Sequence, residues 1–231
     1  MEILYEDNHL IAVNKRVSDI VQADKTGDVP LSEEVKAYIK QKYNKPGEVF
    51  LGVPHRVDRP VSGVVLFART SKALERLNKM FQEHDREIEK IYWAVVGNMP
   101  ASEEATLVHH LTRDEAKNRT TAHDRQRAGS REALLDYRII NRGQRYYLLE
   151  IKLRTGRHHQ IRCQLAKIGC PIKGDLKYGF PRSNEGGGIH LHARSLSFLH
   201  PVTGEPLTII ATPPIKDNLW RFFYNNLEGR S

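Results

Sequence analysis

The sequence contains only two cysteines and no long apolar run. Cys163 and Cys170 lie seven residues apart, a spacing that fits neither a disulfide framework nor a Cys-x-x-Cys metal site. No segment approaches the roughly 20 apolar residues of a membrane-spanning helix. Residues 1–7 are acidic and lack the basic start and apolar centre of a signal peptide. We therefore expect a cytoplasmic protein with no membrane partner, in which both thiols are small buried or half-buried groups.

Acidic residues are fewer than basic ones in this chain. The 231 residues include 36 Lys and Arg against 28 Asp and Glu, which gives a net charge of +8. A composition of 39% hydrophobic and 28% charged residues excludes an intrinsically disordered chain. The positive excess favours a polyanionic partner, nucleic acid first. No repeat, coiled coil or linker divides the sequence, so we expect one domain over residues 1–231.

Hydrophobic periodicity predicts a mixture of strands and helices. Strands are expected within residues 3–14, 49–53, 64–68, 91–96, 133–140, 145–153, 190–198 and 206–211. Helices are expected over residues 31–42, 71–83, 157–168 and 215–226. The strand–helix–strand order over 64–96 is typical of a mixed α/β unit.

The segment 109–132 has few large apolar residues, which predicts an exposed loop or an irregular hairpin. Its basic residues are Arg113, Lys117, Arg119, Arg125, Arg127 and Arg131. A flexible basic arm of this kind would bind nucleic-acid phosphates. Because Asp114, Glu115 and Asp124 dilute the positive charge, an ordinary solvated loop is the alternative, and both interpretations stay open.

The run 55–63, HRVDRPVSG, places a single acid between two cations in a loop that leads into a buried strand. A loop held by a rigid strand can keep Asp58 both exposed and fixed. Arg56 and Arg59 would attract a polyanion and favour the ionised carboxylate. Taken alone, an aspartate beside arginine is more often a local cap or salt bridge than a catalytic group.

Three further motifs follow along the chain. Lys90-Ile91-Tyr92 lies in a predicted strand, and 154–162, RTGRHHQIR, opens a predicted helix and continues into 169–179, GCPIKGDLKYG. The run 189–193, IHLHA, forms part of a later strand. In this order the motifs resemble those of the RluA-type pseudouridine synthases, whose catalytic loop usually reads His-Arg-Leu-Asp, two variable residues, then Thr-Ser-Gly. The resemblance covers roughly residues 3–212.

The resemblance implies an α+β fold: a mostly antiparallel, bifurcated sheet with flanking helices and a central RNA-binding cleft. It implies an enzyme that isomerises uridine in structured RNA without a cofactor or a metal, with ribosomal RNA favoured and transfer RNA as the other substrate. Asp58 corresponds to the catalytic aspartate, Tyr92 to the tyrosine that stacks on the target base, and Arg162 to the arginine that pairs with the aspartate.

Five residues are implied to bind the substrate. Arg56 matches the arginine that replaces the flipped uridine in the RNA stack, and Ile161 would pack beneath the uracil. His55, Arg157 and Gln160 belong to the same two motifs and are predicted to contact the RNA. A monomer is the expected oligomeric state.

The chain departs from the family pattern at several positions. Val57 replaces a common leucine, a change between aliphatic side chains. Val61 stands where threonine is usual, which removes one hydroxyl near the site. Lys15 is not followed by the usual proline. The catalytic part begins near residue 3, so we expect no S4 RNA-binding domain ahead of it.

Other functions remain alternatives at this stage. A non-catalytic RNA-binding or RNA-folding factor could share the scaffold, although Asp58, Tyr92 and Arg162 are all present. A glycoside hydrolase generally needs two carboxylates across the sugar, and only Asp58 lies in a convincing site loop. The histidine pairs at 109–110 and 158–159 and the His-x-His at 190–192 do not form a recognised metal-binding pattern.

Overall fold

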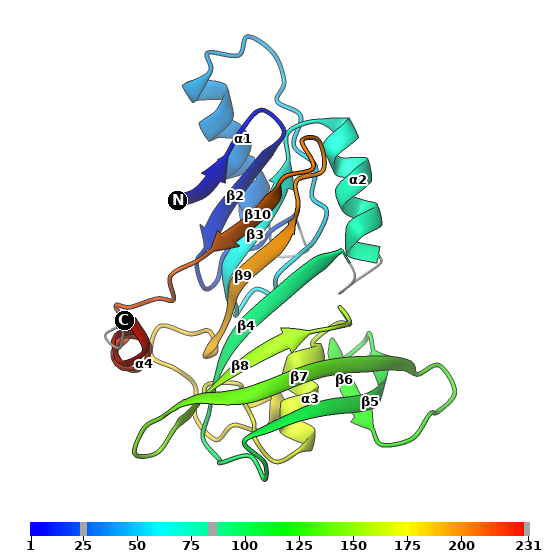
Figure 1. Ribbon diagram of the computed structural model, residues 1–231, viewed down its shortest axis with the longest axis vertical. Helices are drawn as coiled ribbons and strands as arrows, with labels where there is room; N and C mark the ends of the chain where they lie inside the picture. The colour runs from blue at the N-terminus through cyan, green and yellow to red at the C-terminus, as the bar shows by residue number, and fades with distance from the viewer. Residues whose placement is uncertain (24–26, 83–86, 229–231) are drawn as a thin grey trace.

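The computed structural model describes residues 1–23, 27–82 and 87–228, in which helices flank one ten-stranded sheet (Figure 1). The strands are β1 (Glu2–Glu6), β2 (Leu10–Lys15), β3 (Ser62–Ala68), β4 (Ile88–Val96), β5 (Glu104–Asp114), β6 (Arg119–His123), β7 (Arg131–Arg142), β8 (Tyr147–Leu153), β9 (Leu191–Leu199) and β10 (Pro206–Ile210). The helices are α1 (Leu31–Lys42), α2 (Ser71–Gln82), α3 (Gln160–Lys167), α4 (Asn218–Glu228) and the short 3-10 helix η2 (Leu176–Tyr178).

The sheet forks at β9. The strand order is β1-β2-β3-β9-β4-β8-β7-β5-β6, and β10 also pairs with β9. β4 runs along one edge of β9, whereas β3 meets only the start of β9 and β10 meets its end. The β3–β9 pair is parallel and all the other pairs are antiparallel. The predicted α+β class with a mostly antiparallel, bifurcated sheet is therefore confirmed.

Gly63 makes the short parallel pairing possible. Its φ is +116°, and a Cβ at this position would collide with the backbone of Ala193 in β9. Only glycine combines this φ with so close an approach of two backbones. The loop that carries Asp58 therefore enters β3 directly at the fork of the sheet.

The helices cover different parts of the sheet. α1 and α2 lie in the half that contains β1–β3 and β10, and α3 lies in the half that contains β5–β8 (Figure 1). Apolar residues at helical spacing in α1 (Leu31, Val35 and Ile39) are buried in the main core, which extends through Ile161 of α3. The main core therefore joins both halves, and the helices do not form a separate layer.

The predicted helices at 31–42 and 71–83 are confirmed as α1 and α2, although residue 83 lies outside the described residues. The predicted strand at 49–53 is wrong, since only an isolated bridge from Gly52 to Ala68 forms there. The third predicted helix starts late, at Gln160, because His159 has a φ of +50°. The last helix starts at Asn218, after Asp217 has accepted hydrogen bonds from the Leu219 and Trp220 N–H groups.

The sequence predicts an exposed loop or an irregular hairpin over 109–132; the loop is wrong, and the segment is largely a regular hairpin of paired strands. Most of it belongs to β5, β6 and the start of β7, which pair with one another in the sheet. Leu111, Ala122 and Ala133 are buried against Cys163 of α3. A few small or medium apolar residues are sufficient here because α3 covers this part of the sheet. Arg113 and Arg119 consequently lie on paired strands, whereas Arg125 and Arg127 lie in the connection between β6 and β7.

Candidate active site

The predicted site residues come together around one cavity of about 1050 Å³. It is lined by all of them: His55, Arg56, Asp58, Tyr92, Arg157, Gln160, Ile161 and Arg162. The loop before β3 supplies the first three, β4 supplies Tyr92, and the segment that opens α3 supplies the rest. Segments about 100 residues apart in the chain therefore form the opposite walls of this cavity.

Asp58 lies in a tight turn, in which the Val61 N–H donates to the Asp58 carbonyl at 3.0 Å. Its side chain is 34% exposed. Beneath the turn, the buried ammonium of Lys15 donates to the carbonyls of Arg59 (3.2 Å) and Val61 (2.6 Å). Burial lowers the pKa of Lys15 to about 8. The turn is therefore held through its backbone, and the carboxylate remains accessible.

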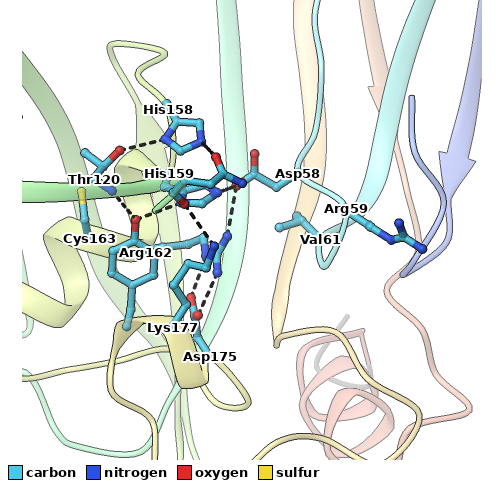
Figure 2. Close-up of polar contacts among 12 residues, drawn as sticks. Asp58, Arg59, Val61, Thr120, His158, His159, Arg162, Cys163, Asp175 and Lys177 are labelled. Atoms are coloured by element: carbon cyan, nitrogen blue, oxygen red, sulfur yellow. Dashed lines mark hydrogen bonds and ion pairs between the residues drawn. The ribbon is translucent and has the colours of Figure 1, made fainter. Parts of the chain in front are cut away.

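Arg162 forms its shortest contacts with Asp175. Its Nε and one terminal nitrogen donate to the two oxygens of Asp175 at 2.7 and 2.8 Å, and both side chains are buried. The other terminal nitrogen lies 3.5 Å from Oδ2 of Asp58. Figure 2 shows Arg162 between these two carboxylates. The structure thus brings Arg162 to Asp58, and it adds Asp175 as the group that fixes the guanidinium.

His159 is a site residue that the sequence analysis missed. Its Nε2 lies 3.5 Å from Oδ2 of Asp58, and its Nδ1 lies 2.9 Å from the hydroxyl of Tyr178. Burial, with the Arg162 charge next in weight, lowers the pKa of His159 to about 2, so the imidazole is neutral near pH 7. In the sequence it belonged to the RTGRHHQIR motif and to a histidine pair considered for a metal site, and neither observation indicated a contact with Asp58.

Tyr92 and Ile161 give the cavity an aromatic and an apolar surface. Burial and the nearby Asp58 carboxylate raise the pKa of Tyr92, so its phenol is protonated at neutral pH. Ile161 is buried in the first turn of α3. A flat ring and an aliphatic side chain around one carboxylate suit a planar, uncharged ligand group such as a base.

The predicted RNA-contacting residues differ in what holds them. Arg56 is exposed, and Arg157 donates from its Nε to the Glu132 carbonyl at 3.2 Å. Arg59, in contrast, points away from Arg162 in Figure 2 and pairs with Asp28 at 2.7 Å. Arg56 and Arg59 both line the cavity, and the guanidinium of Arg59 is engaged by Asp28.

Two other predicted contacts are used within the protein. His55 stacks on Phe81 with ring centroids 4.6 Å apart, and its Nε2 accepts from the Leu66 N–H. Gln160 accepts from the Thr155 hydroxyl at 2.8 Å and donates to the Leu134 carbonyl at 3.0 Å. These bonds support the loop and the start of α3, so an RNA contact by either residue stays a prediction.

Within residues 1–23, 27–82 and 87–228, no group of three or more His, Cys, Asp or Glu side chains is arranged to hold a metal ion. In the same part of the chain, no helix has the length and apolar character needed to cross a bilayer. The titratable groups that line the cavity include the Asp58 carboxylate, the Tyr92 phenol and the His159 imidazole. Such a carboxylate can act as a nucleophile or as a general base.

Comparison with known proteins finds a matching family profile and several similar sequences. A profile described as RNA pseudouridylate synthase matches residues 9–167. The tRNA pseudouridine synthase C of Pectobacterium carotovorum subsp. carotovorum is 32% identical over 234 residues, which cover 91% of this chain and 58% of that protein. The Ribosomal large subunit pseudouridine synthase D of Xanthomonas campestris pv. campestris is 32% identical over 237 residues, which cover 96% of this chain and 68% of that protein. The chain thus spans only part of the length of these relatives.

Among solved structures, the fold is similar to that of Human RNA Pseudouridylate Synthase Domain Containing 4. The TM-score is 0.76 at 23% sequence identity, and the match covers 98% of this chain and 92% of the human one. This likeness covers nearly the whole chain, so the two proteins share the same overall fold.

Proposed function

Because the chain belongs to the RNA pseudouridylate synthase family, a family of isomerases, we propose that it converts uridine in RNA to pseudouridine with Asp58 as the catalytic group. The observation that carries this proposal is the setting of Asp58. Its partly exposed carboxylate lines a cavity shared with Tyr92 and is faced by the buried Arg162. The lone acid of the sequence motif thus has a cation on one side and open space on the other.

The reaction needs only acid–base and nucleophilic chemistry. The bond from N1 of the base to C1′ of the ribose breaks, and a bond from C5 to the same carbon forms. The C5 hydrogen leaves as a proton and N1 gains a proton, so no oxidant or reductant takes part. Asp58 either attacks as a nucleophile or takes the proton that starts an elimination. In both cases the Arg162 charge stabilises the ionised carboxylate.

The cavity requires the uridine to leave the RNA stack before it can reach Asp58. We assign to Arg56 the role of filling the gap, because a guanidinium plane stacks on bases and also pairs with phosphates. Tyr92 and Ile161 would then hold the extruded base. The basic residues Arg113 and Lys177 line the far side of the cavity, where they would contact the RNA backbone.

The substrate is structured RNA, with transfer RNA and large-subunit ribosomal RNA as the first candidates. The relatives named above are a tRNA pseudouridine synthase and a ribosomal large subunit pseudouridine synthase. The net charge of +8 suits either polyanion. A cytoplasmic location and a monomeric state are part of the same proposal.

Tritium release from RNA labelled at C5 of uridine tests the proposal, because forming the C5–C1′ bond displaces that hydrogen. Transfer RNA and ribosomal RNA fractions are assayed separately with the wild type and Asp58→Asn. We expect release by the wild type, none by Asp58→Asn, and RNA binding within about threefold in both. Asp136→Asn, which alters a carboxylate paired with Arg154 on the sheet surface, is the matched control and should release tritium normally.

Two outcomes would contradict the proposal. RNA binding by the wild type without release from either fraction would support the non-catalytic RNA-binding alternative. Equal release by the wild type and Asp58→Asn would remove Asp58 from the chemistry, whatever the identity of the RNA.

A further inference from the structure

A chain of buried polar contacts runs from the β5–β6 hairpin to Asp58. The backbone N–H of Thr120 donates to the Tyr178 hydroxyl at 2.9 Å, and that hydroxyl lies 2.9 Å from Nδ1 of His159. The last contact in this series is between Nε2 of His159 and Oδ2 of Asp58, which lie 3.5 Å apart. Thr120, Tyr178 and His159 are 3%, 5% and 8% exposed, so solvent does not interrupt it.

In this series of contacts, only one arrangement of donors and acceptors gives every hydrogen an acceptor. A backbone N–H can only donate, so the Tyr178 oxygen accepts from Thr120 and its own hydrogen is available for His159. A neutral imidazole carries its hydrogen on one nitrogen. If Nδ1 of His159 accepts from Tyr178, the hydrogen resides on Nε2 and points toward Asp58.

The His159 ring is also clamped from its other side. His158 stacks on it with ring centroids 3.8 Å apart. The two nitrogens of His158 contact the Thr120 hydroxyl at 2.8 Å and Oδ1 of Asn118 at 3.0 Å. Figure 2 shows His158, His159 and Thr120 gathered beside Asp58. Both histidines are therefore tied to the hairpin.

His159 keeps this position in an unfavourable backbone conformation. Its φ of +50° lies in the left-handed region, which is uncommon for residues other than glycine, although histidine, asparagine and aspartate adopt it more often than other side chains do. The strain is retained at the residue that links the start of α3 to Asp58. Strain of this kind often marks a functional position.

We propose that His159 and Tyr178 are positioning residues for Asp58, an assignment that rests on the proposed function. Tyr178 fixes the tautomer of His159, and His159 then presents its Nε2–H to Oδ2 of the carboxylate. Arg162 approaches the same oxygen. Because both donors face Oδ2, they orient the carboxylate and direct Oδ1 to the substrate.

The separation of 3.5 Å is longer than an ordinary hydrogen bond. Catalytic contacts are often long in the free enzyme and shorten when substrate binds. The positioning role therefore predicts an effect on kcat, which reports the bound state, with little effect on KM for the RNA.

Two substitutions at His159 separate positioning from support of the fold. A glutamine amide reaches roughly the place of Nε2 and keeps an N–H for Asp58, whereas an asparagine amide reaches roughly the place of Nδ1 and keeps only the Tyr178 contact. Asparagine, however, tolerates the left-handed backbone better than glutamine. If His159 only supports the fold, His159→Asn should equal or exceed His159→Gln in both stability and kcat. If His159 positions Asp58, His159→Gln should have the higher kcat.

The experiment measures kcat and KM for tritium release, together with thermal unfolding, for the wild type, His159→Gln, His159→Asn and Tyr178→Phe. We expect kcat to fall about tenfold in His159→Asn and Tyr178→Phe, the rate equivalent of losing one hydrogen bond to a charged group. His159→Gln should retain kcat within about threefold, and KM should stay within about twofold throughout.

The inference is overturned if His159→Asn equals or exceeds His159→Gln in kcat, or if Tyr178→Phe turns over like the wild type. If the wild type releases tritium and the variants have the same kcat as the wild type, only the positioning role is refuted. Absence of release by the wild type refutes the proposed function instead, so the two failures are distinguishable. If Tyr178→Phe fails to fold, the comparison of the two His159 variants still decides.

Discussion

The two walls of the cavity hold their charged groups in different ways. On the wall formed by the catalytic loop, Asp58 is one-third exposed and its turn is fixed through backbone carbonyls that accept from Lys15. On the opposite wall, Arg162 and Asp175 are buried and joined by two short hydrogen bonds. The carboxylate that we propose to react thus lies on the accessible wall, and the groups proposed to orient it lie on the buried wall, called the dry wall below.

The difference shows how a single carboxylate can be both reachable and directed. Side-chain contacts that buried Asp58 would block the substrate, so the loop is held from beneath by its backbone. Charge and direction come from across the cavity, where burial strengthens electrostatic interactions. Preorganisation in the opposite wall costs no rearrangement during the reaction. Cutting contacts on each wall therefore should have unequal effects.

The largest effect is expected from Asp175→Asn on the dry wall. The substitution leaves the buried Arg162 guanidinium without its full counter-charge, and breaking such a pair costs about 3–5 kcal/mol. We expect a loss of that size in the free energy of unfolding, measured by urea denaturation. Tritium release should fall as well, because the guanidinium is no longer held toward Asp58.

Asp28→Asn is the matched control on the accessible wall. It breaks the Arg59–Asp28 pair, whose side chains are 45% and 51% exposed, and it should change the free energy of unfolding by about 1 kcal/mol or less. The double variant Arg162→Met with Asp175→Asn should be more stable than the sum of its single changes predicts. Equal losses in Asp175→Asn and Asp28→Asn would show that burial does not distinguish the walls.

A second effect is expected at β9, where the two halves of the sheet join. His192 is fully buried, its Nδ1 lies 2.9 Å from the Ser62 hydroxyl, and its Nε2 lies 3.0 Å from the Ala211 carbonyl. Burial lowers the pKa of His192 to about 4, against about 6.5 for the unfolded chain. Between these values the unfolded state binds a proton that the folded state does not, so stability falls as pH falls.

This linkage predicts a loss of about 1.4 kcal/mol per pH unit from His192 between pH 6 and pH 4. His192→Gln should flatten the pH dependence of the free energy of unfolding by that amount, because the amide keeps a donor for Ala211 and does not titrate. Parallel curves for the wild type and His192→Gln would contradict the assignment.

The sequence predicted the accessible wall better than the dry one. Asp58, Arg56 and Tyr92 lie in short motifs that resemble those of a known family, and their predicted roles came from that resemblance. The bond between Arg162 and Asp175 joins residues 13 apart, and it depends on the turn that brings η2 back against α3. Periodicity carries no information on such a contact. Periodicity likewise does not predict the role of Lys15. In the sequence it is the polar end of a strand, and only the fold places its ammonium beneath the loop.

The fold class was predictable from the order of the motifs, whereas the regular strand pairing over 109–132 was not, since the sequence predicted only a loop or an irregular hairpin there. Residues 109–132 carry too few large apolar side chains to read as strands, because only one face of β5–β6 is covered, by α3. The backbone pairing with β7 supplies the remaining stabilisation and depends on strands elsewhere in the chain. The contact of Thr120 with Tyr178 follows from that pairing and was equally hidden.

The smallest effect is expected from Val61→Thr, which restores the hydroxyl that the family pattern has beside Asp58. Val61 contributes to the turn through its N–H and its carbonyl, both of which threonine retains. Because Val61 is only 2% exposed, a buried hydroxyl should cost about 1 kcal/mol in the free energy of unfolding. We expect kcat for tritium release to stay within about threefold of the wild type. An increase of tenfold or more would show that a side-chain donor in the loop also orients Asp58, and that the accessible wall is not held through its backbone alone.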